Sequence, residues 1–130
     1  MKTYTLRRAG GGLLATRAAL VHTGLVVRLL LAVDTGSLYT IVEPTFLTAL
    51  GMDPAKAVER VEIVGIGGQR RVPRLTVEHF HCFGQRLSAV QVLTLDFSRI
   101  LPSIHGLLGL RELRASQATI DVVQNVVTIP

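Results

Sequence analysis

The residue best placed to do chemistry in this sequence is Asp34, which stands between two apolar runs and is followed directly by Thr35, Gly36 and Ser37. The run at 29–33 is typical of a strand buried on both faces, so the acid falls where a buried strand becomes a loop. An unpaired carboxylate is costly in such a place. The pattern therefore indicates either a turn, in which Asp34 accepts hydrogen bonds from the next two amides, or a carboxylate with a functional role.

Two glycine-containing segments follow in the chain. Residues 61–72 have two strand-like arms around a Gly-Ile-Gly-Gly tip, which is typical of a β-hairpin. The glycines of the tip permit positive φ and let backbone amides approach a bound chain closely. Residues 104–113 predict a buried strand that ends in a glycine-capped turn and a short helix.

The sequence Asp34-Thr35-Gly36-Ser37, with apolar residues on both sides, resembles the catalytic loop of the aspartic proteases. It is similar to the single-lobe, retropepsin-like branch of that family, which includes bacterial members. The resemblance implies that Asp34 is one half of a catalytic carboxylate pair and that Thr35 forms hydrogen bonds across a dimer axis. It also implies that Gly36 lets the loop fold tightly and that the Ser37 hydroxyl supports the carboxylate.

The two glycine-containing segments match the same family in the same chain order. The first resembles the flap that covers a bound substrate, with Ile66 best placed to press on that substrate. Its candidate residues are Gly65, Ile66, Gly67 and Gly68. The second resembles the strand that lies beside the catalytic loop, and its candidate residues are Leu107, Leu108 and Gly109. The three matches together extend the resemblance over about residues 13–129.

Two positions depart from the family pattern. His105 stands where many relatives have an acid before the glycine. Leu110 stands where retroviral members have an arginine that ties the following helix to the rest of the lobe, and Arg111 is one position away. These departures put that local salt bridge in doubt, and they leave the carboxylate pair unaffected.

Composition and charge limit the other classes of function. The chain has 130 residues, 48% hydrophobic and 5% aromatic, which suits one globular domain with a core of Val, Leu and Ile. Its net charge is +5, but the arginines are scattered and no aromatic residues alternate with them as a stacking platform requires. We therefore predict no nucleic-acid partner, and a basic β-barrel that binds nucleic acid in a salt-dependent way stays open as an alternative.

The cysteine and histidines predict no cofactor. Cys82 is the only cysteine, so no intrachain disulfide forms, which fits a reducing compartment. His79 and His81 fall on one face of an expected strand and Cys82 on the other, whereas zinc needs about four convergent ligands. We predict surface histidines, a core thiol and no metal. Because no apolar stretch of about 18 residues and no clear signal peptide are present, we also expect no membrane segment and a cytoplasmic location.

Most of the expected elements are strands. We divide the chain into an N-terminal arm, 1–12, whose residues 3–6 could form a strand with a partner, and one domain, 13–130. Hairpins are expected at 13–33, 61–72, 73–95 and 119–129, and short helices at 43–51 and after Gly109. The resemblance implies a mostly β fold: a closed, retropepsin-like β-barrel lobe with one or two short helices that forms a two-fold homodimer.

The resemblance implies an aspartic endopeptidase that acts on extended, largely apolar polypeptide segments. Hydrolysis of this kind needs two carboxylates around one water, and Asp34 is the only Asp followed by Thr-Gly. A homodimer would supply the second carboxylate as the Asp34 of another copy. The alternative is a non-catalytic dimerisation or peptide-binding module on the same fold.

Overall fold

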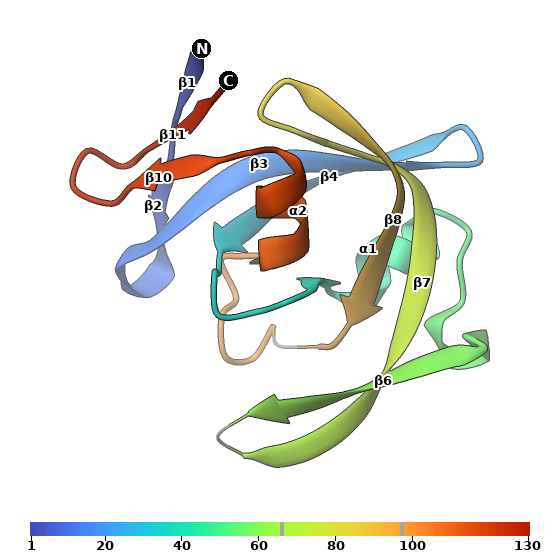
Figure 1. The fold of residues 1–130 in the computed structure, drawn as a ribbon. Coiled ribbons are helices and arrows are strands. Elements are labelled where there is room, and N and C mark those ends of the chain that lie inside the picture. The colour runs from blue at the N-terminus through green and yellow to red at the C-terminus, as the bar shows by residue number, and fades with distance from the viewer. Residues whose placement is uncertain (66, 97) are drawn as a thin grey trace.

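The structure, a computed structural model, describes residues 1–65, 67–96 and 98–130 and consists mostly of strands (Figure 1). The strands are β1 (Lys2–Thr5), β2 (Arg7–Ala9), β3 (Leu13–His22), β4 (Leu25–Val33), β5 (Thr40–Val42), β6 (Glu59–Gly65), β7 (Gly68–Cys82), β8 (Gln85–Thr94), β9 (Gly106–Leu108), β10 (Thr119–Asp121) and β11 (Val126–Ile129). The helices are α1 (Pro44–Ala49) and α2 (Leu110–Ala115), with 3-10 turns at Gly10–Gly12 and Pro54–Lys56. Among these described residues, no helix combines the length and the hydrophobicity that crossing a membrane requires.

Eight of the strands form one sheet that closes on itself. Their order is β2-β3-β4-β9-β5-β8-β7-β6, and an additional pairing of β3 with β7 joins the two sides of the sheet. The β3–β4 hairpin turns at Thr23 and Gly24, which both have positive φ, as a tight two-residue turn between twisted strands requires. The predicted mostly β, barrel-like lobe is thus confirmed.

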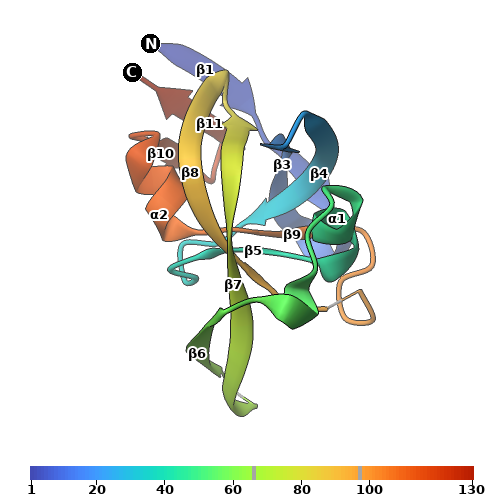
Figure 2. The ribbon, with the colours of Figure 1, turned by 90° about the vertical axis from the view of Figure 1, so that its right-hand side faces the viewer.

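One strand is longer than the sequence indicated. We expected a break between the hairpin at 61–72 and the strand pair that begins at Pro73, but β7 runs through Pro73 without interruption. Pro73 pairs with Arg60 of β6, whereas β8 pairs with β7 only from Arg74 onward. At Pro73 the strand therefore has a partner on one edge alone, which is where a residue without an N–H is tolerated. The β6–β7 hairpin consequently projects well beyond the barrel (Figure 2).

The two ends of the chain form a second sheet, in the order β1-β11-β10. Lys2 pairs with Ile129 and Thr5 with Val126, so the strand expected within residues 3–6 forms with the C-terminal strand of its own chain. β2 then pairs with β3. The division of the chain at residue 12 stays a prediction, although the residues before it are paired with the rest of the fold.

The core is aliphatic, as the composition predicts. Among the described residues, Phe80 is the single aromatic one in the set of largest fully buried side chains, which otherwise are Leu20, Leu31, Leu47, Leu50, Leu93, Ile104, Leu108, Val42, Val77, Val92 and Val127. The first helix also forms as predicted, with Pro44 in its first turn and Gly51 at φ 80° just after its end. These side chains hold together the strands that enter and leave the loop at Asp34.

Candidate active site

Asp34 occupies the first position of the loop between β4 and β5. Its N–H donates to the carbonyl of Leu108 at 3.0 Å, and the Ser37 N–H donates to the Asp34 carbonyl at 3.2 Å. One carboxylate oxygen, Oδ1, accepts the N–H of Gly36 at 2.9 Å. Asp34 is half-buried, while Thr35 and Gly36 are exposed. The turn expected from the sequence therefore exists, and it holds a carboxylate that solvent can still reach.

The glycine of the motif stands close to the acid. A Cβ at Gly36 would lie 3.2 Å from Asp34 Oδ1, tighter than an ordinary contact. The absence of a side chain thus lets the backbone N–H of Gly36 reach the carboxylate. This is the tight folding of the loop that the resemblance implied.

Ser37 does not support the Asp34 carboxylate as the resemblance implied. Its hydroxyl donates instead to the carbonyl of Tyr39 at 2.7 Å. The Ser37 carbonyl accepts the N–H of Leu110 at 2.7 Å. Ser37 therefore braces the loop and joins it to α2, and its contribution to the position of Asp34 is indirect.

The segment Leu107-Leu108-Gly109 lies directly beside the loop. β9 pairs in parallel with β4, with Val33 opposite Leu108, and antiparallel with β5, with Ile41 opposite Leu107. It therefore separates the strand that enters the loop from the strand that leaves it. A Cβ at Gly109 would lie 2.3 Å from the carbonyl carbon and oxygen of Tyr39, so only glycine fits against this backbone.

The helix that follows is joined to the loop by main-chain bonds. The N–H of Arg111 donates to the carbonyl of Leu38 at 3.1 Å, next to the bond from Leu110 to Ser37. The Arg111 guanidinium also lies 4.8 Å from the centre of the Tyr39 ring, a cation–π distance. Arg111 therefore contacts the loop with both its backbone and its side chain.

Two polar residues behind the loop were missed from the sequence. The Thr40 hydroxyl accepts the N–H of Gly109 at 3.0 Å, and both Thr40 and Glu112 are buried. Burial raises the pKa of the Glu112 carboxyl, and hydrogen bonding from the side chain and main chain of Thr40 opposes that rise. Oxygen Oε1 of Glu112 has no hydrogen-bond partner in the part of the chain that the structure describes. A glutamate in the first turn of a short helix is normally expected on the surface, so no sequence signal indicated that Glu112 is buried.

The β6–β7 hairpin has glycines on both sides of its tip, and its role as a flap stays a prediction. Gly65 pairs with Gly68, and Gly68 has φ 109°, a conformation that side chains other than glycine rarely adopt. Neither residue has an atom within 4 Å of an added Cβ. The role expected of Ile66 falls outside the described residues. In both ribbon views the hairpin projects from the barrel on its own, away from the terminal sheet (Figures 1 and 2).

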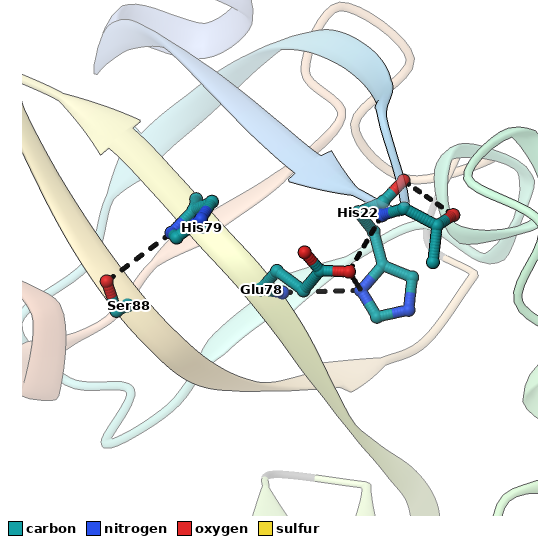
Figure 3. Close-up of polar contacts among 5 residues, drawn as sticks. His22, Glu78, His79 and Ser88 are labelled. Carbon is teal, nitrogen blue, oxygen red and sulfur yellow. Dashed lines mark hydrogen bonds and ion pairs between the residues drawn. The ribbon is translucent and has the colours of Figure 1, made fainter.

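His22 on β3 and His79 on β7 each form a polar contact with a side chain on a neighbouring strand. His79 Nδ1 lies 3.4 Å from the Ser88 hydroxyl, and His22 Nδ1 lies 3.9 Å from Glu78 Oε1 (Figure 3). Glu78 and His79 are consecutive in a strand, so the acid and the His79–Ser88 pair lie on opposite faces of the sheet. Nowhere in the described ranges do three His, Cys, Asp or Glu residues gather as metal ligands would.

Cys82 is buried, as predicted, whereas His81 is exposed. Burial raises the pKa of the Cys82 thiol to about 12. The thiol is therefore neutral at physiological pH and is not a nucleophile.

The sequence model of one family, the aspartyl proteases, matches residues 20–111. The chain belongs to the aspartyl protease family. The match covers the loop at Asp34, the hairpin and the strand beside the loop, which are the three elements from which the resemblance was argued. A search of curated protein sequences gave no match.

Two solved structures show the same fold. A retropepsin-like aspartic protease from Rickettsia conorii has a TM-score of 0.73 at 16% identity, covering 97% of this chain and 88% of that one. The retroviral protease-like domain of Ddi1 from Leishmania major has a TM-score of 0.59 at 20% identity, covering 90% and 87%. The predicted retropepsin-like fold is confirmed.

Proposed function

We propose that this aspartyl protease family member is an aspartic endopeptidase whose catalytic carboxylate is Asp34. The observation that carries the proposal is that the Asp34 carboxylate is held in place and is still accessible. One of its oxygens accepts the Gly36 N–H, Asp34 itself is half-buried, and the next two residues, Thr35 and Gly36, are exposed. A carboxylate held in this way has a fixed direction and stays accessible to a water and a substrate. It is suited to act as the general base on an attacking water.

The second carboxylate would come from another copy of the chain. The carboxylates of Asp53, Asp96 and Asp121 each accept a hydrogen bond from a residue two positions later, in turns of their own. None of them is followed by Thr-Gly. In a two-fold dimer the exposed Thr35 would face its counterpart and bring the two Asp34 side chains together. Two carboxylates so close share a proton, and one acts as base while the other donates to the scissile carbonyl.

The substrate would be an extended polypeptide held by the flap. The loop and the hairpin each carry an exposed apolar side chain: Leu38 of the loop is 54% exposed and Val64 of the hairpin is 76% exposed. They support a preference for apolar side chains near the cleaved bond. Main-chain hydrogen bonds to an extended segment would supply the rest of the binding, with alternate side chains entering pockets.

The first test is hydrolysis of a denatured protein between pH 3 and 8. We expect a bell-shaped rate profile in the acid range, because the pair is active only when it holds one proton. Asp34→Asn should abolish hydrolysis and leave the circular dichroism spectrum unchanged, while the matched turn variant Asp121→Asn should keep full activity. A purified Asp34→Asn protein that still cleaves would contradict the assignment. Peptide binding by the native chain without cleavage would favour the non-catalytic module.

A mixing experiment tests the use of two chains. Asp34→Asn chains are added to an equal amount of native chains, and subunit exchange is first verified with mass-tagged protein. With random pairing, about a quarter of the dimers contain two native chains, so total activity falls to about half of that of the native protein alone. Full activity after demonstrated exchange would mean that each chain works by itself.

A further inference from the structure

A cavity in the described part of the structure lies away from the loop at Asp34. It has a volume of about 800 Å³, and its arginine and histidine lining residues are Arg7, Arg17, Arg28, His81 and His105. No acidic residue lines it, and neither do the residues of the catalytic loop. Arg28 lies on β4, six residues before Asp34 at the start of the loop, which is roughly 20 Å at the rise of an extended chain. The cavity is therefore a separate feature from the candidate active site.

Strand pairing explains why a hollow forms here. On one edge, β3 pairs with β2 through residues 13–15 and with β7 through residues 19–21. Between these two partners the edge of β3 at Arg17 has no strand beside it, and the Arg17 carbonyl is approached by the Cys82 thiol at 3.8 Å. The gap between β2 and β7 thus opens the sheet surface at Arg17.

The strand register places the three arginines in one line. Arg7 is opposite Ala15, Arg17 is opposite Leu30 and Arg28 is opposite Ala19. Directly opposite residues share a face and so do alternate residues of a strand, so all three arginines project from the same face of the sheet. Each is the diagonal neighbour of the next, at about 7–8 Å. His81 is also opposite Ala19 and adds a fourth basic group beside Arg17.

Among the described residues, Arg7, Arg17 and Arg28 form no ion pair with a carboxylate. The ion pairs recorded among the described residues are His22 with Glu78 and Arg74 with Glu59. Arg7, Arg17 and Arg28 are all exposed. Like charges at this spacing repel one another, so an uncompensated line of three on a net basic protein favours an anionic occupant.

His105, one of the two departures from the family pattern, also lines this cavity. Its Nδ1 accepts the N–H of Leu30 at 2.9 Å, so in the neutral ring the proton is on Nε2, which is a donor. Many relatives have an acid at this position. Compared with an acid at this position, histidine places no negative charge on the cavity wall and supplies a hydrogen-bond donor.

We propose that this cavity, the basic cavity, is a binding site for an extended acidic polypeptide segment. Alternate side chains of an extended chain are about 6.6 Å apart and point to the same side. That spacing is close to the diagonal separation of the arginines, so acidic residues at every second position could pair with Arg7, Arg17 and Arg28 in turn. The guanidinium group suits carboxylates because it binds both oxygens at once. The site requires no catalysis, so it stands independently of the proposed protease activity.

The test uses the full chain carrying Asp34→Asn, which prevents cleavage of the probe. The probe is a fluorescein-labelled octapeptide of alternating glutamate and serine, and its counterpart has glutamine in place of glutamate. Fluorescence anisotropy at low salt should show binding of the glutamate peptide and at least about tenfold weaker binding of the glutamine peptide. Binding should weaken with added salt, since the attraction is between exposed charges.

The variants separate the cavity from the overall charge. Arg17→Gln combined with Arg28→Gln should raise the dissociation constant at least about tenfold. The matched control is Arg8→Gln combined with Arg60→Gln, which removes the same charge: Arg8 adjoins Arg7 but projects from the other face, and Arg60 lies on β6. The control should change binding less than twofold. The dissociation constant of Arg17→Lys should lie between those of the native protein and the glutamine variant, because lysine keeps the charge but lacks the planar guanidinium group.

Three results would overturn the proposal. One is equal binding of the glutamate and glutamine peptides. Another is an equal loss of binding in the cavity variants and in the control, which would indicate attraction to net charge alone. The last is a duplex oligonucleotide that binds in an Arg17-dependent way while the glutamate peptide does not, because the occupant would then be a nucleic acid.

Discussion

Gly109→Ala tests whether the strand beside the loop fixes the position of the loop. The new methyl group would lie 2.3 Å from the carbonyl carbon and oxygen of Tyr39 and 2.6 Å from the N of Thr40. An ordinary contact begins at 3.4 Å, so the loop backbone must move by about 1 Å. Gly109 has φ −89°, which any residue adopts, so the effect is steric alone.

The expected loss of stability follows from what a movement of 1 Å would disturb. Overpacking against neighbours that yield costs about 1–3 kcal/mol. The same movement would stretch the bonds that Gly109, Leu110 and Arg111 donate to the loop, each with a net contribution of about 1 kcal/mol. We expect a loss of roughly 3–5 kcal/mol, a large part of the 5–15 kcal/mol typical of a domain. For a chain of this size the midpoint of thermal unfolding would fall by roughly 10–20 °C.

The assay is urea and thermal unfolding followed by circular dichroism. The matched control is Gly65→Ala, because an added Cβ there has no atom within 4 Å and its φ is not positive. The control should stay within about 1 kcal/mol of the native protein. A Gly109→Ala protein with native stability would show that the loop backbone yields freely, and the argument that β9 positions Asp34 would fail.

Three further changes test other parts of the site. Thr35→Ala should weaken the dimer and leave the monomer folded, because the side chain is exposed within one chain; an unchanged dimer constant in sedimentation would argue against a role across the axis. Gly68→Val should slow turnover through its φ of 109°, whereas Gly65→Val should have a smaller effect; equal rates in both would show that the hairpin is not a flap. Burial raises the pKa of Glu112, so its contribution to stability is present at low pH and is lost as pH rises through the folded value. The free energy of unfolding of Glu112→Gln should therefore increase relative to that of the native chain as pH rises from 4 to 7. The opposite trend would refute the burial argument.

The loop at Asp34 could be found from the sequence because its interactions are local. The bond from Gly36 to Asp34 spans two residues, and the apolar run that precedes it marks a buried strand. The glycines at 65 and 68 were found for the same reason, since a hairpin tip brings near neighbours together. Residue types at short spacing are enough when the geometry depends on a single turn.

Interactions between distant segments could not be predicted in the same way. The Ser37 hydroxyl had several possible acceptors, and the burial of Glu112 depends on how α2 docks against Thr40, 72 residues earlier in the chain. The line of Arg7, Arg17 and Arg28 follows from the register of three strands, and a shift of one residue in either pairing would send an arginine to the other face. Arginines that are far apart in the sequence thus line one basic cavity in the fold.

The structure also resolves the doubt that Leu110 raised. The bonds that hold α2 against the loop come from the backbone N–H groups of Gly109, Leu110 and Arg111, so they form whatever side chain stands at position 110. What they do require is the missing side chain of Gly109 and the hydroxyl of Thr40, its acceptor. An arginine at position 110 would add a salt bridge, whereas main-chain hydrogen bonds already hold α2 against the loop. Its absence therefore does not argue against a correctly placed Asp34, whereas a residue other than glycine at position 109 would.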